Sequence, residues 1–186
     1  MNRRYKYALA VAGAVAGATA LAYATRTSEP LTTVQQVDLH RYAGTWYEIA
    51  RYPNRFQKKC DSDTTATYLL RDDGTVGVLN SCRKSDGTMT SSKGTAKVVD
   101  QATNAKLKVT FFWPFSGDYW IIDLAPDYSY AVVGEPSRKY LWILSRTPQM
   151  DDTTYREITE RIRFLGYDPT RLLKTKQSAG SQPKTG

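Results

Sequence analysis

The feature that most constrains this chain is a series of eight short β-rich runs, separated from one another by turn residues. The runs recur at intervals of about ten residues and span 45–52, 64–71, 75–83, 93–100, 106–113, 117–124, 129–135 and 140–146. The Asp-Asp-Gly link at 72–74 is a strong hairpin signal, because Asp and Gly tolerate the positive φ of tight turns. Even spacing with short links indicates an antiparallel up-and-down barrel or sandwich.

The hydrophobic pattern changes to a helical period after Pro148. Apolar residues recur at helical spacing over 155–165, and Asp151 or Asp152 can cap the start of this segment. Gly166 is typical of a helix end, because glycine adopts the left-handed conformation without strain. We therefore expect one C-terminal α-helix, packed on the outside of the sheet.

The two ends of the chain are not expected to belong to the fold. Residues 1–24 combine three basic residues with an uncharged Ala-rich stretch that ends in a small-x-small sequence. This pattern is typical of a cleaved signal peptide, and an uncleaved membrane anchor is the alternative. Residues 25–36 are expected to form a linker. The polar residues 174–186 are expected to form a disordered tail.

Composition narrows the classes of function. Residues 1–24 hold three basic residues and no acidic one, so their removal lowers the formal net charge from +8 to +5, and we expect no nucleic-acid partner. His40 is the only histidine and precedes the first run, so we interpret it as a turn or surface residue. We expect no metal, no cofactor and no catalytic residues. Aromatic residues make up 12% of the chain, which favours a binding protein over an enzyme.

Three short motifs follow one another along this pattern. Gly-Thr-Trp at 44–46 opens the first run, Asp-Tyr at 127–128 lies between the sixth and seventh runs, and Arg146 ends the last run. Together they resemble the three motifs of the lipocalin family, and the resemblance covers residues 37–173. Longer stretches such as 142–148 are similar to the bacterial outer-membrane subgroup, which is related to apolipoprotein D and plant temperature-induced lipocalins.

The resemblance implies an all-β fold, an eight-stranded antiparallel up-and-down barrel with one C-terminal α-helix packed outside. In that fold Trp46 would close the floor of the barrel. Arg146 would lie across its ring and donate hydrogen bonds to backbone carbonyls near 38–42. These motif residues would hold the fold together and would not contact the ligand. The residues given this structural role are Gly44, Trp46, Asp127, Tyr128 and Arg146.

An eight-stranded barrel encloses room for one small ligand, and side chains alternate between its interior and its outside. If Trp46 points inward, strand parity predicts an apolar and aromatic lining that suits an acyl chain. The predicted lining residues are Glu48, Ala50, Tyr52, Tyr68, Val78, Val109, Phe111, Trp113, Tyr119, Ile121, Val132, Trp142 and Leu144. Glu48 is the charged member, and we expect it to bond to a neighbouring tyrosine or trapped water, with a ligand contact as the alternative.

Two loops are expected near the mouth of the barrel. The Phe-Trp-Pro-Phe sequence at 112–115 follows the fifth run and either contacts a membrane, a ligand or a second copy, or folds back onto the barrel. Arg55, Lys58 and Lys59 lie beside Phe56 in the first long loop. These cations either attract an anionic headgroup or form solvated surface.

Cys60 and Cys82 lie at chain segments that the hairpin at 72–74 brings close together. In an exported protein we expect them to form a disulfide. Ideal register places residue 60 nearer to residue 87, so a bulge or loop must absorb the difference. A reactive cysteine thiol is the alternative.

The sequence therefore predicts a lipid-binding lipocalin that stores or transports a fatty acid or a lysophospholipid for cell-envelope maintenance. We expect export to the periplasm or outer membrane. No cysteine precedes Cys60, so no lipidated cysteine is expected at the signal junction. A lipocalin-scaffold enzyme acting on a hydrophobic substrate and a membrane-anchored interaction module are the alternatives, and a homodimer is compatible with the sequence.

Overall fold

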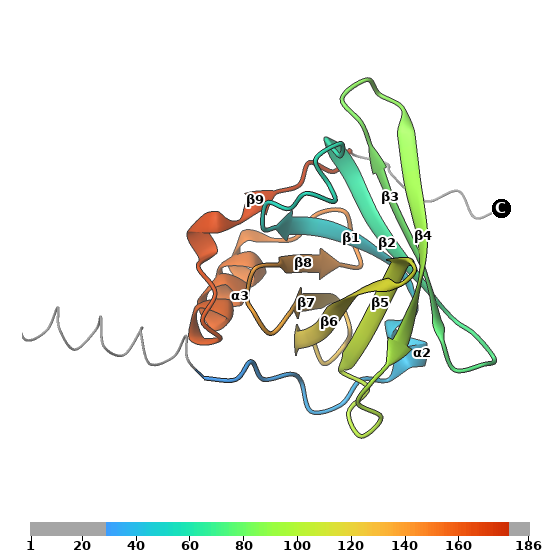
Figure 1. The fold of residues 1–186 in the computed structure, drawn as a ribbon. Coiled ribbons are helices and arrows are strands. Elements are labelled where there is room, and N and C mark those ends of the chain that lie inside the picture. Colours follow the sequence, from blue (N-terminus) through green and yellow to red (C-terminus); the bar gives the residue numbers. More distant parts are fainter. Residues whose placement is uncertain (1–28, 179–186) are drawn as a thin grey trace, which may run out of the picture.

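The computed structural model describes residues 29–178 and contains a closed antiparallel β-barrel (Figure 1). Eight strands follow one another around the barrel, β1 also pairs with β2 to close it, and the short β9 adds to β1. The predicted fold class is confirmed. The strands are β1 (Gly44–Arg51), β2 (Ser62–Leu70), β3 (Val76–Arg83), β4 (Met89–Val98), β5 (Lys106–Phe112), β6 (Phe115–Leu124), β7 (Tyr130–Gly134), β8 (Leu141–Ser145) and β9 (Leu173–Lys174).

The short helix α2 (Leu39–Tyr42) precedes β1 and lies at the closed end of the barrel (Figure 1). The side chain of Asp38 caps it by accepting hydrogen bonds from the backbone N–H groups of His40 and Arg41, at 2.9 and 3.2 Å. His40 is exposed on this helix, which confirms its interpretation as a surface residue.

Helix α3 (Asp152–Phe164) packs on the outside of the barrel, against β1, β7 and β8 (Figure 1). Asp151 caps its start by accepting a hydrogen bond from the Thr154 N–H at 2.9 Å. Gly166 follows its end with a φ of 83°. The 3-10 helix η1 (Pro169–Arg171) then leads the chain back towards β1, so the predicted position of the helix is confirmed.

The buried apolar side chains form two clusters, one on each side of the sheet. The inner cluster fills the closed end of the barrel around Trp46 and Tyr42. The outer cluster joins Ile158 and Ile162 of α3 to Ile143 of β8. Burying a side chain of this size stabilises the fold by about 1.5–3 kcal/mol, so α3 is an integral part of the structure.

Two irregularities in the ladders change which face of the sheet a residue occupies. In β1 the register against β8 shifts between Glu48 and Ala50, which makes Ile49 an extra residue. In β6 the register against β7 shifts between Ile121 and Asp123. Because side chains alternate with every residue, one extra residue reverses the face of all positions that follow it.

The segments that flank the barrel pack against it within the described range. Leu31, in the predicted linker, is buried in the outer cluster, and the Val34 N–H donates to the Ile121 carbonyl at 3.0 Å. Residues 174–178, in the predicted disordered tail, hydrogen-bond to β1 and β2. The prediction of a disordered tail is wrong for residues 174–178, because polar composition does not reveal the backbone groups that neighbouring strands leave to be paired. The linker at 25–36 stays a prediction.

The predicted signal peptide at 1–24 and residues 179–186 lie outside the described residues. Between residues 29 and 178, no helix is long and apolar enough to cross a membrane. In the same part of the chain, His, Cys, Asp and Glu side chains form no group of three or more that could hold a metal ion.

Candidate functional site

The closed end of the barrel is held by a contact between Trp46 and Arg146. The guanidinium carbon of Arg146 lies 3.8 Å from the centre of the buried Trp46 ring. Arg146 donates hydrogen bonds to the backbone carbonyls of Arg41, Tyr42 and Thr45, at 2.6, 3.2 and 3.0 Å. The indole N–H of Trp46 donates to the Tyr42 carbonyl at 2.8 Å. The predicted contacts of both residues are confirmed, and their role in stability stays a prediction.

The other motif residues also serve the closed end. Asp127 and Tyr128 form the turn between β6 and β7, and the Tyr128 hydroxyl accepts a hydrogen bond from the Asp38 N–H at 2.9 Å. The guanidinium of Arg41 lies 4.0 Å from the centre of the Tyr128 ring. Gly44 begins β1 with a φ of 92°, a conformation that favours glycine. The turn at Asp127 and Tyr128 therefore anchors α2 through its contacts with Asp38 and Arg41.

Three tyrosine hydroxyl groups meet inside the barrel near its closed end. The Tyr119 hydroxyl oxygen lies 2.8 Å from the hydroxyl oxygens of both Tyr42 and Tyr68. Burial raises the pKa of all three phenols, that of Tyr68 to about 12. They therefore stay neutral at physiological pH. A cavity of about 20 Å³, room for roughly one water molecule, adjoins them.

The interior becomes more accessible with distance from the closed end. Along the inner face of β3, Val76 and Val78 are buried and Asn80 is exposed, whereas Cys82, which forms the disulfide, is buried again. Along the inner face of β6, Ile121 is buried whereas Gly117 is exposed. The inner face is therefore apolar at the closed end and more accessible at the opposite end, the mouth, an arrangement that suits a ligand with one apolar end.

Most of the predicted lining residues lie on the inner face of the barrel. Glu48 stands opposite Leu144 in the ladder between β1 and β8, so the two share a face. Contact of these residues with a ligand stays a prediction. The predicted residues that lie in or against the inner cluster are Tyr68, Val78, Val109, Phe111, Tyr119, Ile121, Trp142 and Leu144.

The predictions for Ala50 and Tyr52 are wrong. Both lie in the outer cluster, beneath α3. The extra residue Ile49 reverses the alternation, so Arg51, opposite Trp142 in β8, faces the interior in their place. No sequence pattern marks this bulge.

The predictions for Val132 and Trp113 are also wrong. Val132 lies in the outer cluster, whereas its neighbours Ala131 and Val133 belong to the inner cluster. This part of β7 is covered on both faces, so it has no polar alternation from which the inner face can be inferred. Trp113 is 89% exposed, because β5 ends at Phe112 and the chain turns there.

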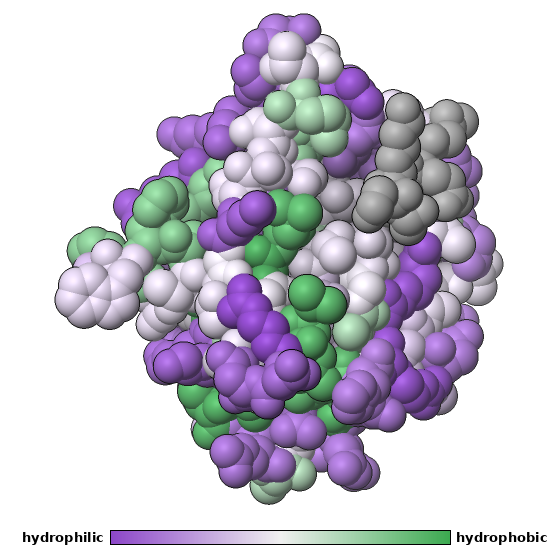
Figure 2. Space-filling view, turned by 90° about the vertical axis from the view of Figure 1, so that its right-hand side faces the viewer, coloured by the Kyte–Doolittle hydropathy of each residue, from purple (hydrophilic) through white to green (hydrophobic). Residues whose placement is uncertain are grey.

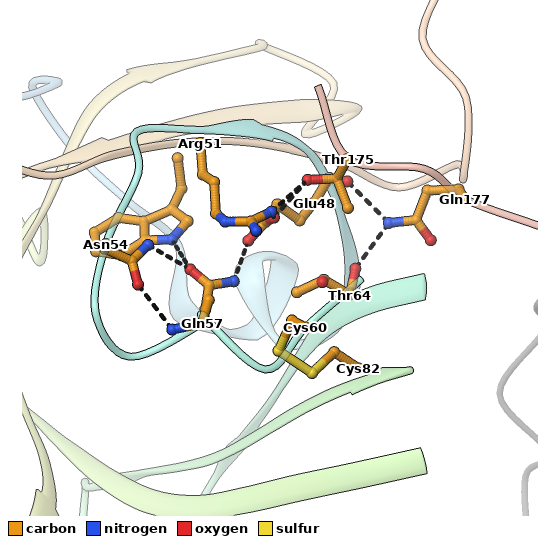
Figure 3. The surroundings of a disulfide bond; sticks show 10 residues. Glu48, Arg51, Asn54, Gln57, Cys60, Thr64, Cys82, Thr175 and Gln177 are labelled. Atoms are coloured by element: carbon orange, nitrogen blue, oxygen red, sulfur yellow. Dashed lines mark hydrogen bonds and ion pairs between the residues drawn. A yellow bond between two sulfur atoms is a disulfide. The ribbon is translucent and has the colours of Figure 1, made fainter. Parts of the chain in front are cut away.

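Glu48 is buried among polar side chains on the inner wall (Figure 3). Its carboxylate accepts hydrogen bonds from Arg51 at 2.7 Å, Gln57 at 2.6 Å and the Thr175 hydroxyl at 2.5 Å. Gln57 in turn accepts a hydrogen bond from the Trp142 indole N–H at 2.9 Å. These partners replace the expected tyrosine. Sequence reasoning missed Arg51 because strand parity without the bulge at Ile49 places it outside, and it missed Gln57 and Thr175 because they come from separate segments of the chain.

Residues 173–178 form a C-terminal strap that fills the place where β1 and β2 separate. The ladder between β1 and β2 ends at Tyr47, and beyond it β1 pairs with β9. The side-chain amide of Gln177 donates to the carbonyls of Glu48 in β1 and Thr64 in β2, at 2.8 and 2.9 Å (Figure 3). The strap therefore completes the barrel wall between these strands.

Cys60 and Cys82 form a disulfide, with Cα atoms 5.5 Å apart, which confirms the predicted pairing. The bond joins the loop after β1 to β3, beside the Glu48 network (Figure 3). A shift of the β2–β3 register between Ser62 and Thr65 absorbs part of the expected mismatch, and Cys60 reaches Cys82 from the loop that precedes β2. With both sulfur atoms bonded, the alternative of a reactive thiol is wrong for this form of the protein.

An aromatic tip projects from the barrel at the hairpin between β5 and β6. Phe112, Trp113 and Phe115 are 78, 89 and 78% exposed. Figure 2 shows a projection of pale and green residues at the left edge of a face that also carries green residues at its centre and hydrophilic residues around them. Phe56, in the loop after β1, is also exposed, although its ring contacts that of Tyr140 with centres 5.5 Å apart.

The motif contacts, the closed barrel and the outer helix agree with the comparisons to known proteins. A family model described as a lipocalin-like domain matches residues 37–177. This chain belongs to the lipocalin family. Temperature-induced lipocalin-1 of Arabidopsis thaliana is 46% identical over 156 residues, which cover 80% of this lipocalin and 83% of the relative.

A bacterial relative covers the lipocalin even more completely. Outer membrane lipoprotein Blc of Escherichia coli (strain K12) is 41% identical over 169 residues, or 88% of this chain and 95% of the relative. Among solved structures, insecticyanin from the tobacco hornworm Manduca sexta matches with a TM-score of 0.66 and 22% identity, over 81% of this chain and 86% of that one. This last likeness shows the fold alone.

Proposed function

We propose that this lipocalin binds one long-chain amphiphile, with the chain in the barrel and the polar headgroup at the mouth. The observation that carries the proposal is the gradient of the inner wall along β6, from buried Ile121 through half-buried Tyr119 to exposed Gly117. An acyl chain gains free energy when its surface leaves water for such a wall. A barrel of eight strands would crowd two chains, which favours a fatty acid or a lysophospholipid.

Charge near the mouth supports an anionic headgroup. Arg55, Lys58 and Lys59 are exposed in the loop after β1, beside Phe56. A cluster of cations on a rim raises the local concentration of an anionic ligand. The headgroup would thus stay hydrated at the rim while the chain lies inside.

The proposed role is storage or transport of this lipid in an exported protein, for maintenance of the cell envelope. The bacterial relative, 95% of which matches this chain, is an outer membrane lipoprotein, which supports a place in the envelope. No cysteine precedes Cys60, so we propose the periplasm or outer membrane without a lipidated cysteine at the signal junction.

Native mass spectrometry of the purified protein, followed by displacement of a fluorescent fatty acid, tests this proposal. We expect copurified lipid, and saturable uptake of lysophospholipid at one molecule per chain. Val78→Lys, which places a charge on the inner wall, should weaken uptake at least about tenfold. Leu69→Lys, on the exposed outer face of β2, is the matched control and should leave uptake unchanged. No bound lipid and no saturable uptake would overturn the proposal.

The aromatic tip favours a second candidate function, contact with a membrane during lipid exchange. Aromatic side chains this exposed are costly in water and gain by entering the headgroup region. Replacing Phe112, Trp113 and Phe115 by Ser should reduce binding to phosphatidylglycerol vesicles, whereas Phe164→Ser, on α3, should not. If the triple variant instead loses a concentration-dependent dimer and vesicle binding is unchanged, the tip is a homodimer contact.

A further inference from the structure

The hydroxyl groups of Tyr42, Tyr68 and Tyr119, here called the tyrosine triad, leave one hydrogen-bond donor unused. The triad contains two contacts of 2.8 Å, from Tyr119 to each of the others. Each contact uses one hydroxyl hydrogen, and three hydroxyls supply three. However these hydrogens are arranged, one is left over. Between residues 29 and 178, no further hydrogen-bond partner reaches these three oxygens.

The unused donor lies in apolar surroundings. The cavity of about 20 Å³ beside the triad is otherwise lined by Leu39, Ala43, Leu70, Val76, Ala96, Leu107 and Val109. None of these side chains can accept a hydrogen bond. Buried polar groups are nearly always paired, so the triad needs an acceptor that the barrel itself does not supply.

The chemistry of the surroundings restricts the acceptor to an uncharged one. The Arg146 guanidinium acts electrostatically on Tyr42, but it already donates to the carbonyls of Arg41, Tyr42 and Thr45. The three phenols are neutral, because burial raises the pKa of each. A carboxylate or phosphate here would exchange its hydration shell for one hydrogen bond. A ketone, aldehyde or ester carbonyl loses far less hydration free energy when it leaves water.

We propose that the tyrosine triad is a recognition site for an uncharged acceptor oxygen at the inner end of the ligand, such as a ketone, aldehyde or ester carbonyl. This inference rests on the proposed lipid binding. If the inference is right, the closed end of the barrel determines which of several lipids with the same headgroup binds more tightly. When the inner end of the ligand is a plain methyl group, a water molecule has to accept the hydrogen bond.

The test compares two series of ligands by displacement of a fluorescent fatty acid. One series is saturated fatty acids of increasing chain length, and the other is the same acids with a ketone next to the terminal methyl group. For the length that reaches the triad, the ketone acid should bind about tenfold more tightly than its parent, as one hydrogen bond implies. Equal affinities at every length would overturn the inference and leave lipid binding intact. Failure of both series to displace the probe would instead contradict lipid binding itself.

Variants separate the triad from other causes of a preference. Replacing all three tyrosines by Phe removes every hydroxyl and should abolish the preference for ketone acids. Tyr68→Phe leaves two hydroxyls and one contact, so one donor remains and the preference should persist. Tyr130→Phe, which removes a hydroxyl bonded to Arg161 outside the barrel, is the matched control. If the triple variant does not fold, the wild-type comparison decides alone. A preference that survives in a folded triple variant would assign the ketone contact elsewhere.

Discussion

The hydroxyl group of Thr175 donates a hydrogen bond to the buried carboxylate of Glu48, with the two oxygen atoms 2.5 Å apart. The two residues are separated by almost the whole barrel in sequence. Glu48 also pairs with Arg51 at 2.7 Å. A buried charged group is stable only when hydrogen bonds replace those it made with water. The C-terminal strap supplies one of these hydrogen bonds to Glu48, through Thr175.

Truncation after Leu172 should therefore destabilise the barrel. The shortened chain loses the bonds from Thr175 and Gln177 to Glu48 and Thr64, and it leaves part of the Glu48 carboxylate unpaired. We expect the free energy of unfolding to fall by about 2–4 kcal/mol, measured by urea denaturation. Truncation after Ser178 keeps these contacts and should change stability little. Equal stability of the two truncated proteins would show that the strap does not support the barrel.

The strap should also loosen in acid, through Asp63. Burial by itself raises the pKa of this carboxyl group, but hydrogen bonds from Ser178 and Arg83 outweigh burial and lower it below its ordinary value. A group with a lowered pKa stabilises the fold above its ordinary pKa, and this stabilisation is lost as pH falls through the lowered value.

Stability should therefore decline below about pH 4, with faster hydrogen exchange at the Ser178 amide. Asp63→Asn cannot ionise, so its stability should depend less on pH in this range. An unchanged acid limb in this variant would remove Asp63 as the cause.

Replacement of Arg146 should affect stability before ligand binding. Arg146→Ala removes the contact with the Trp46 ring and three hydrogen bonds to backbone carbonyls, so we expect a loss of about 2–4 kcal/mol. Arg146→Lys keeps the charge but not the planar fork of donors, and it should recover only part of that loss. Thermal unfolding measures the first effect, and fatty-acid titration well below the melting temperature measures the second. A variant with wild-type melting and no ligand binding would contradict this assignment.

Loss of the disulfide should lower stability without changing the fold. Cys60 and Cys82 close a loop with a sequence separation of 22, for which chain entropy gives about 3 kcal/mol. The Cys60→Ser, Cys82→Ser protein should unfold at correspondingly lower denaturant concentration and keep its β-sheet circular dichroism. Alkylation of the unreduced wild-type protein should label no thiol. Labelling of both cysteines would show that the pair is reduced.

The sequence predicted the succession of strands and the outer helix because these depend on local patterns. Turn residues at regular spacing separate the strands, and the cap at Asp151 with Gly166 bounds the helix. For the strands and the helix, a few neighbouring residues hold the whole signal. The contact between Trp46 and Arg146 was expected from the resemblance to the lipocalin motifs.

The tertiary structure alone decided which residues face the interior and how the wall is completed. The extra residue Ile49 turns Tyr52 outward, and burial of β7 on both faces conceals that Val133, and not Val132, points inward. The bond from Thr175 to Glu48 forms only after the barrel has closed. The alternation of side chains along a strand is local. The register of the strand, its bulges and the packing on its two faces are set by partners distant in sequence, so no single segment carries that information.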